Sequence, residues 1–184
     1  MSNSKSILKK EDIFKIVLTA MLISINIVLE RFLDYSVWNL SLNFGAIPIA
    51  FAACYLGIPY AMAVGGLGDL LGAIIKPFGA YFVGYTITNL LIGLIIGIFL
   101  KKANIINITL GVITCKLFCS LLLNTFWIAF TSSKGMKIYW AVLVNRAPAI
   151  AVMAVIEIVL IFILFSEKSH ISKRIRKTIN SLIK

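Results

Sequence analysis

One carboxylate stands in a stretch of the chain that is otherwise rich in glycine and apolar residues. Asp69 lies in GGLGDLLGAIIKPFGAYFVG, residues 65–84, ten positions after Pro59. Ten helical residues span roughly 15 Å, so in a membrane Asp69 is deep, and a lipid-facing carboxylate there costs several kcal/mol. We therefore expect Asp69 either to bind a ligand, or to pair with a buried cation or cap a neighbouring helix.

Aromatic and amide side chains recur at helical spacing just after Asp69. Tyr81, Tyr85 and Asn89 are four residues apart, which places them on one side of a helix. Gly93 and Gly97 continue this series, and small residues allow close helix packing, so we expect them to close the floor below a cavity. The alternative for the two tyrosines is an aromatic belt at the membrane surface.

Further polar and aromatic side chains lie near the same predicted end of the helices. They predict a cup with one acid, several amides, aromatic faces and cationic groups, which suits a flat, nitrogen-rich ring that carries an anionic group. The carboxylate would accept from an amino-pyrimidine edge, and Arg or Lys would bind the anion. The predicted substrate-binding residues are Arg31, Trp38, Asn43, Phe44, Asp69, Lys76, Tyr81, Tyr85, Asn89, Asn124, Trp127 and Arg146.

The composition indicates that lipid is the solvent of these elements. Of the 184 residues, 60% are hydrophobic and 14% are charged, and the mean hydropathy is +1.00. A soluble domain of this size cannot bury so much apolar surface. The net charge of +11 therefore reports orientation in the membrane, and we expect no binding to nucleic acid.

The apolar runs predict an all-α integral membrane protein with six transmembrane helices. Gly57 and Pro59 divide the run from Phe44 to Ile75 into two short helices joined by a tight turn, because proline removes a helical donor. The expected spans are residues 13–33, 44–57, 60–75, 80–100, 106–130 and 139–165.

Basic residues cluster before the first span, after the fourth and after the sixth, which makes both termini cytoplasmic by the positive-inside rule. The expected organisation is a cytoplasmic tail over 1–12, a membrane domain over 13–165 with an outer lid loop over 31–43, and a basic tail over 166–184. The last tail has amphipathic spacing and would lie on the inner leaflet, or simply be a solvated basic end.

Other residues in the predicted inner half favour packing or protein contacts. Ala20 and Ser24 form a small-xxx-small pair, which suits contact with a partner or packing within the chain. Lys116 and Glu157 lie at similar depth, so an intramembrane ion pair with a structural role is plausible. The three cysteines lie in apolar runs, and we expect them to be buried and reduced.

The sequence contains no motif for nucleotide hydrolysis, metal binding or nucleophilic catalysis. There is no glycine-rich phosphate loop ending in Gly-Lys-Ser/Thr, no metal-ligand cluster and no nucleophile–base pair. We therefore expect neither an enzyme nor a cofactor, and the chain has no ATP-hydrolysing motif.

Three segments carry a resemblance to a known family. GDLLG at 68–72, KPFGAYFVG at 76–84 and NRAPAI at 145–150 resemble the substrate-binding (S) subunits of energy-coupling factor (ECF) transporters, closest to the folate-type branch. The likeness covers about residues 13–165. The family has an Ala-x-x-x-Ala motif that contacts the coupling subunit, and Ala20–Ser24 departs from it only at the second small residue.

The resemblance implies a six-helix bundle in the bacterial plasma membrane that binds folate near the outer face under a lid. It also implies a transmembrane coupling subunit and two cytoplasmic ATPases as partners. Sibling branches bind riboflavin, thiamin or other nutrients, so another vitamin is the first alternative. A small membrane enzyme and a scaffold protein without a ligand are the others.

Overall fold

The computed structural model describes residues 10–32, 35–37, 40–42, 44–77, 81–102, 104–133 and 135–165, with the single residues 173, 177 and 181. Trp38 and Asn43, most of both predicted tails and part of the lid loop lie outside the described residues.

Six helical passes form the described chain, as the apolar runs predict. The first is α1 (Lys10–Ile27) extended by the π-helix η1 (Val28–Phe32), and the fifth joins three consecutive helical segments. The other elements are α2 (Ala46–Tyr55), α3 (Ile58–Ile75), α4 (Val83–Phe99), α5 (Ile105–Thr114), the π-helix η2 (Cys115–Leu123), α6 (Asn124–Thr131), the 3₁₀ helix η3 (Gly135–Ile138) and α7 (Tyr139–Phe165).

The break between the second and third passes lies where Gly57 and Pro59 predict it. The backbone N–H groups of Leu56 and Gly57 both donate to the carbonyl of Ala52 and end α2. Gly57 has φ of 108°, a conformation that favours glycine, and Pro59 sits in the first turn of α3 where its missing N–H costs no helical bond.

The loop between the first two passes contains a small hairpin that the sequence did not predict. Strand β1 (Tyr35–Val37) pairs antiparallel with β2 (Leu40–Leu42), with Ser36 opposite Ser41. Arg31 precedes this hairpin and belongs to η1. The all-α fold class is confirmed, with these two short strands added to the predicted lid segment.

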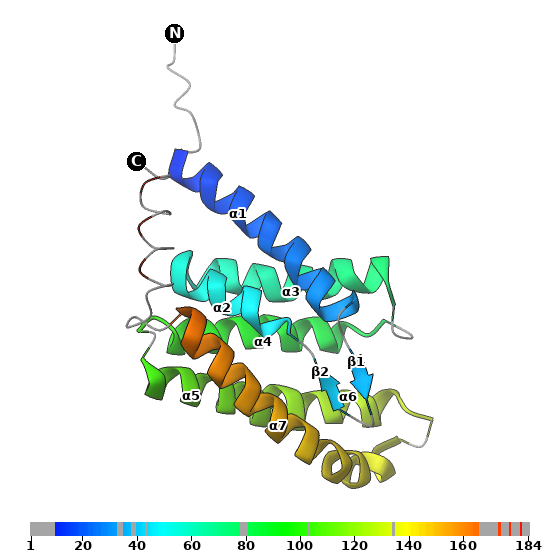
Figure 1. Cartoon of the computed structure of the whole chain (residues 1–184). Coiled ribbons are helices and arrows are strands. Elements are labelled where there is room, and N and C mark those ends of the chain that lie inside the picture. Colours follow the sequence, from blue (N-terminus) through cyan, green and yellow to red (C-terminus); the bar gives the residue numbers. More distant parts are fainter. Residues whose placement is uncertain are drawn as a thin grey trace.

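The passes alternate in direction between two ends of the bundle (Figure 1). One end carries β1 and β2 together with the ends of α3 and α6, and we name it the hairpin end. At the opposite end, α1 begins, α4 ends and α7 ends, and we name it the terminal end. Lys101 and Lys102 directly follow α4 there and are exposed, in agreement with the predicted basic side.

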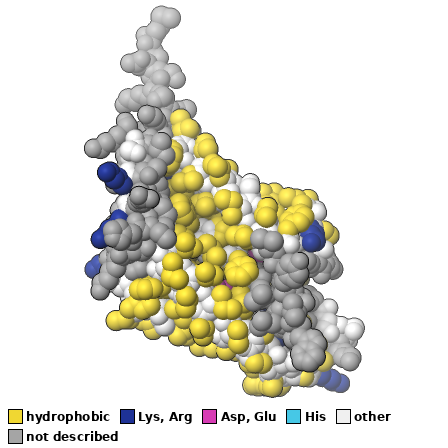
Figure 2. All heavy atoms as spheres, in the orientation of Figure 1, with side chains coloured by type: hydrophobic (Ala, Val, Ile, Leu, Met, Phe, Trp, Pro, Cys, Tyr) yellow, Lys and Arg dark blue, Asp and Glu magenta, His cyan; other side chains and the backbone are white. Residues whose placement is uncertain are grey.

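The surface of the bundle is apolar, as a lipid solvent requires. Figure 2 shows a nearly continuous face of hydrophobic side chains, with basic side chains toward its two ends. Ile74, Trp140 and Val144 are each at least two-thirds exposed. Four helical stretches are long and apolar enough to cross a membrane, namely Glu11–Phe32, Ile58–Ile75, Ile105–Thr131 and Gly135–Phe165, while α2 and α4 are shorter apolar helices.

Small residues bring α3 and α4 into close contact, as their spacing predicts. A Cβ added to Gly93 would lie 2.6 Å from the carbonyl oxygen of Ala61, and one added to Gly65 would lie 2.4 Å from that of Asn89. On the other side of α3, Gly68 faces Asn26 and Gly72 faces Arg31. The small residues of α3 therefore admit the polar side chains of the first pass.

Candidate functional site

A cavity of about 770 Å³ lies inside the bundle. Its rim includes Pro77, Tyr81 and Thr131, which are exposed at the hairpin end. Its deepest lining includes Ile96 and Val112, which are each 1% exposed. The cavity thus opens toward the hairpin end and is closed inside the bundle, and its volume is in the range of small-molecule sites.

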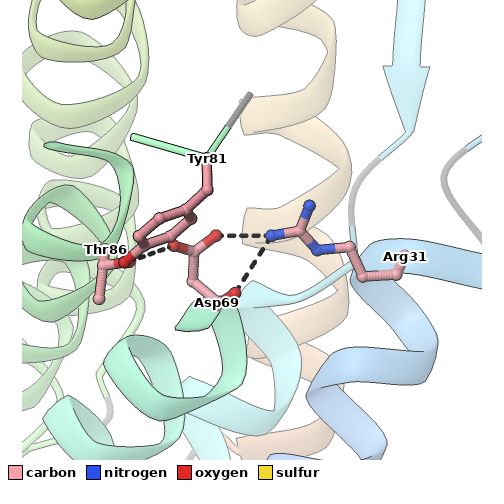
Figure 3. A network of polar contacts seen from close by, with 4 residues as sticks. All are labelled: Arg31, Asp69, Tyr81 and Thr86. Atoms are coloured by element: carbon pink, nitrogen blue, oxygen red, sulfur yellow. Dashed lines mark hydrogen bonds and ion pairs between the residues drawn. The ribbon is translucent and has the colours of Figure 1, made fainter. Parts of the chain in front are cut away.

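Asp69 lines this cavity and is paired with a cation (Figure 3). Arg31 Nη2 donates to Asp69 Oδ1 at 2.8 Å and to its carbonyl oxygen at 3.3 Å. The two side chains are only 9% and 6% exposed. The sequence allowed Asp69 either to bind a ligand or to have a partner within the protein. In the structure it pairs with a buried cation, Arg31, and this pair lies at the wall of a cavity.

Two hydroxyl groups complete the surroundings of the Asp69 carboxylate. Thr86 Oγ1 donates to Asp69 Oδ2 at 2.6 Å. Because that bond uses the only hydroxyl hydrogen of Thr86, the 2.8 Å contact between Tyr81 and Thr86 has Tyr81 Oη as donor. Figure 3 shows the resulting chain of contacts, in which α3, α4, η1 and the loop before α4 each supply one side chain.

Both oxygens of Asp69 therefore accept a hydrogen bond within the protein. The network holds the guanidinium of Arg31 and the ring of Tyr81 at the cavity wall. It also couples the first pass to α3 and α4, because a buried charge needs its partner to remain stable.

Replacing Thr86 by valine, T86V, tests this coupling. The change keeps the side-chain shape but removes the donor to Asp69 Oδ2, and a buried acceptor left without its donor costs about 1–3 kcal/mol. We expect a matching loss of stability in thermal unfolding of the purified protein. T86S, which keeps the hydroxyl, is the control, and equal melting temperatures for T86V and wild type would contradict the coupling.

One face of α4 follows the cavity, although its inner half differs from the prediction. Tyr85 and Asn89 line the cavity, and the lining continues with Ile92 and Ile96. Gly93 and Gly97 do not line the cavity but face α3, where they provide the close packing predicted for them. A four-residue repeat overshoots the helical period of 3.6, so the series turns away from the cavity as it descends.

The wall formed by α6 and α7 carries Asn124 and Arg146, which both line the cavity. Arg146 Nη1 donates to Thr125 Oγ1 at 3.4 Å and forms no salt bridge within the described residues. Asn124 Oδ1 is buried and accepts no hydrogen bond there. Both side chains thus retain hydrogen-bonding capacity on the cavity wall.

A second ion pair lies at the inner end of the cavity. Lys116 Nζ donates to Glu157 Oε1 at 2.5 Å, which confirms the pairing suggested by their similar depth. Lys116 comes from η2 and Glu157 from α7, and both line the cavity. Of the cysteines, Cys115 and Cys119 are buried and Cys54 is partly buried.

Three of the predicted site residues lie outside the cavity lining. Trp127 donates from Nε1 to Thr88 Oγ1 at 3.1 Å and packs on Phe82 at a ring-centroid distance of 5.2 Å. Lys76 is exposed, with its ammonium 4.9 Å from the ring centroid of Phe32. Phe44 is partly buried next to the hairpin but does not line the cavity.

The sequence reasoning did not include several residues of the site, among them Phe82, Thr86 and the pair Lys116 and Glu157. Phe82 lines the cavity and packs edge-on against Tyr85. Thr86 binds Asp69. A deep carboxylate needs donors, so the hydroxyl of Thr86 in the apolar helix after Asp69 was the available signal. Thr86 is not part of the four-residue series Tyr81, Tyr85 and Asn89, so that pattern did not identify it.

The small-residue pair of the first pass faces outward. Ala20 and Ser24 are both exposed, and Ser24 Oγ donates to the carbonyl of Ala20 at 3.1 Å. Ile16, Val17 and Met21 are exposed on the same helix. This arrangement leaves the pair accessible from the membrane, away from the cavity.

A family model and two curated relatives both match most of the chain. Residues 14–165 match the family model described as ECF transporter, substrate-specific component. The chain is 32% identical over 145 residues to the folate transporter FolT of Clostridium novyi (strain NT), which covers 78% of this chain and 83% of that protein. It is 26% identical over 173 residues to FolT of Leuconostoc mesenteroides subsp. mesenteroides, covering 90% and 93%.

The fold also matches a solved structure. A crystal structure of FolT bound with folic acid superposes with a TM-score of 0.72, covering 81% of this chain and 90% of that chain at 23% sequence identity. This likeness supports the six-helix arrangement described above.

Proposed function

Because the chain belongs to the family of ECF transporter substrate-specific components, we propose that it is the folate-binding subunit of such a transporter. It would bind the vitamin from outside a bacterial cell, in the cavity at the hairpin end, and deliver it inward together with its partners. The names of its relatives in Clostridium novyi and Leuconostoc mesenteroides support folate as the ligand.

The observation that carries the proposal is the cavity itself. Its volume of about 770 Å³ suits a drug-sized ligand, and its walls combine aromatic rings with amide and guanidinium groups. Tyr81, Phe82 and Tyr85 offer flat faces to a pterin ring or to a p-aminobenzoyl ring. Arg146, which has no carboxylate partner within the described residues, offers its N–H groups to the glutamate carboxylates.

Arg31 is the second cation suited to those carboxylates. Its pairing with Asp69 holds it at the cavity wall in a fixed position, so a carboxylate would meet a group that is already oriented. Asn89 and Asn124 add amide donors and acceptors to the same cavity. For Trp38 and Asn43 in the lid segment, and for Phe44, Lys76 and Trp127, contact with the ligand remains a prediction from the sequence.

The partners follow from the family. A transmembrane coupling subunit and two cytoplasmic ATPase subunits would supply the energy, since the sequence contains no phosphate-binding loop of its own. We propose that the exposed Ala20–Ser24 surface of α1 contacts the coupling subunit, because small residues allow close approach of another helix. The chain itself would carry out transport without a catalytic step.

Direct binding tests the ligand. The purified protein is expected to bind folic acid at one site and to show quenching of its tryptophan fluorescence, because Trp127 packs on Phe82 at the cavity wall. Isothermal titration with folic acid, reduced folates, riboflavin and thiamin compares the candidates. Binding of riboflavin or thiamin without binding of any folate would show that the substrate is a different vitamin.

A further inference from the structure

The ion pair at the inner end of the cavity has hydrogen-bonding capacity that the protein does not use. Glu157 Oε1 accepts from Lys116, and within the described part of the chain Oε2 accepts no hydrogen bond. The ammonium of Lys116 has three N–H donors and uses one of them there. The Glu157 side chain is 3% exposed, so this capacity is directed away from bulk solvent.

Apart from Ser120, the side chains around the pair are largely apolar. Ile92, Ile96, Val112 and Met153 line the same inner part of the cavity. In such surroundings a polar atom without a partner is costly, and a ligand that offers matching groups regains that free energy on binding. A ligand group complementary to both a carboxylate and an ammonium would therefore bind here with high selectivity.

The backbone that presents Lys116 is also irregular. Lys116 and Ser120 belong to the nine-residue π-helix η2, and both side chains line the cavity. Short π-helical segments within α-helices occur frequently at functional sites, because they change which side chains face the interior. A charge pair that served packing alone would not need to face the cavity.

We propose that Glu157 and Lys116 recognise the amino-pyrimidinone edge of the pterin ring, a role that rests on the proposed binding of folate. This edge presents the 2-amino group and N3–H as donors, next to the O4 carbonyl as an acceptor. The carboxylate of Glu157 accepts from the two donors, and the ammonium of Lys116 donates to O4. Acceptors and donor thus match the edge in the same order.

The sequence suggested Asp69 as the acceptor for the amino-pyrimidine edge. The hydrogen-bond partners of Asp69 and Glu157 instead favour Glu157 in this role. Both oxygens of Asp69 already accept hydrogen bonds, from Arg31 and Thr86. Glu157 accepts from one protein donor only, so Oε2 and a second lone pair of Oε1 remain for the two donors of the ring. Asp69 therefore serves to position Arg31, and Glu157 is the carboxylate that is available to the ring.

The assignment also gives the ligand a direction in the cavity. Along α7, Arg146 and Glu157 are eleven residues apart, which corresponds to about 16 Å. The ring would lie at the closed inner end, and the glutamate carboxylates would lie near Arg146 and Arg31 toward the hairpin end. Arg31, Arg146 and the pair Lys116 and Glu157 then each meet a ligand group of suitable chemistry.

The test compares folic acid with aminopterin, which carries an amino group in place of O4. The ammonium of Lys116 accepts no hydrogen bond, and the ring of aminopterin also lacks the N3–H donor assigned to Glu157, so wild-type protein is expected to bind folic acid at least 10-fold more tightly. The double variant K116M/E157Q removes both charges together and leaves no lone ion in the membrane. It is expected to lose at least 10-fold in affinity for folic acid and to bind the two ligands about equally.

R146M is the matched control, because it acts at the carboxylate end that both ligands share. It is expected to weaken both ligands by the same factor and leave their ratio unchanged. A folded K116M/E157Q variant with wild-type affinity and wild-type preference would overturn the assignment. Failure of the wild-type protein to bind folic acid would instead overturn the proposed function.

A second variant keeps the test decisive if the double variant does not fold. E157D preserves the charge of the pair but withdraws the carboxylate by one methylene group. We expect at least a 10-fold loss of affinity for folic acid, with melting temperature close to wild type. Unchanged affinity in E157D would overturn the role of Glu157.

Discussion

Replacement of Arg31 by methionine, R31M, is expected to lower the free energy of unfolding by about 3–5 kcal/mol. Methionine fills similar space but leaves the carboxylate of Asp69, which is 6% exposed, without its cation. The bond from Thr86 remains but does not neutralise the charge. The same variant is expected to lose folate binding, because it removes a proposed partner of the glutamate carboxylates.

Unfolding in detergent and titration with folic acid separate these two effects. D69N, which leaves Arg31 charged and unpaired, is expected to be similarly unstable. The double variant R31M/D69L replaces the pair by apolar side chains and is expected to regain most of the stability, as seen when buried ion pairs are replaced by apolar groups. It should still bind folate poorly if Arg31 contacts the ligand.

A matched control is available at the surface. Lys15 pairs with Glu11, whose side chain is 47% exposed, so K15M is expected to cost no more than about 1 kcal/mol. Equal effects of R31M and K15M on stability would contradict the importance assigned to the buried pair. If a folded R31M/D69L variant bound folate with wild-type affinity, Arg31 would not be a ligand contact.

Replacement of Gly93 by alanine, G93A, is the second large effect that we expect. The added Cβ would lie 2.6 Å from the carbonyl oxygen of Ala61 and 2.7 Å from the Cα of Met62. These are backbone atoms of α3 and cannot rotate away, so the helices must separate. Overpacking of this kind typically costs about 1–3 kcal/mol, which exceeds the gain in helix propensity from alanine.

G66A provides the control for this prediction at the same helix pair. The Cβ added there would meet the side chain of Leu90, at 2.5 Å from Cδ2, and that side chain can change its rotamer. We therefore expect a smaller loss of melting temperature in G66A than in G93A. G93A should also weaken folate binding, because it shifts Tyr85 and Asn89 on α4. If G93A had a higher melting temperature than G66A, α3 and α4 would have room for a Cβ atom between their backbones.

Local signals were sufficient for the six passes and the position of their breaks. Apolar length defines a span whatever its neighbours are, because the bilayer imposes the same requirement on each helix. Gly57 and Pro59 act on their own backbone, so the end of α2 and the start of α3 follow from two residues. The close packing of α3 and α4 was also predictable from the small residues on both helices.

The partners of the charged residues were predictable only in part. Depth alone suggested that Lys116 and Glu157 pair, because two opposite charges at one level of the membrane need each other. Depth did not show that the pair faces the cavity. That orientation depends on how η2 and α7 are rotated about their own axes in the bundle, which the apolar pattern does not show.

The sequence by itself determined that this is a six-pass membrane protein, that Asp69 must be compensated, and to which family the chain belongs. Only the tertiary structure decided that Arg31 compensates it, that Thr86 completes the contact, and that Glu157 faces the cavity with an oxygen to spare. The physical reason is that burial in lipid acts on each residue separately, whereas a hydrogen bond depends on the relative rotation and separation of helices that are distant in the chain.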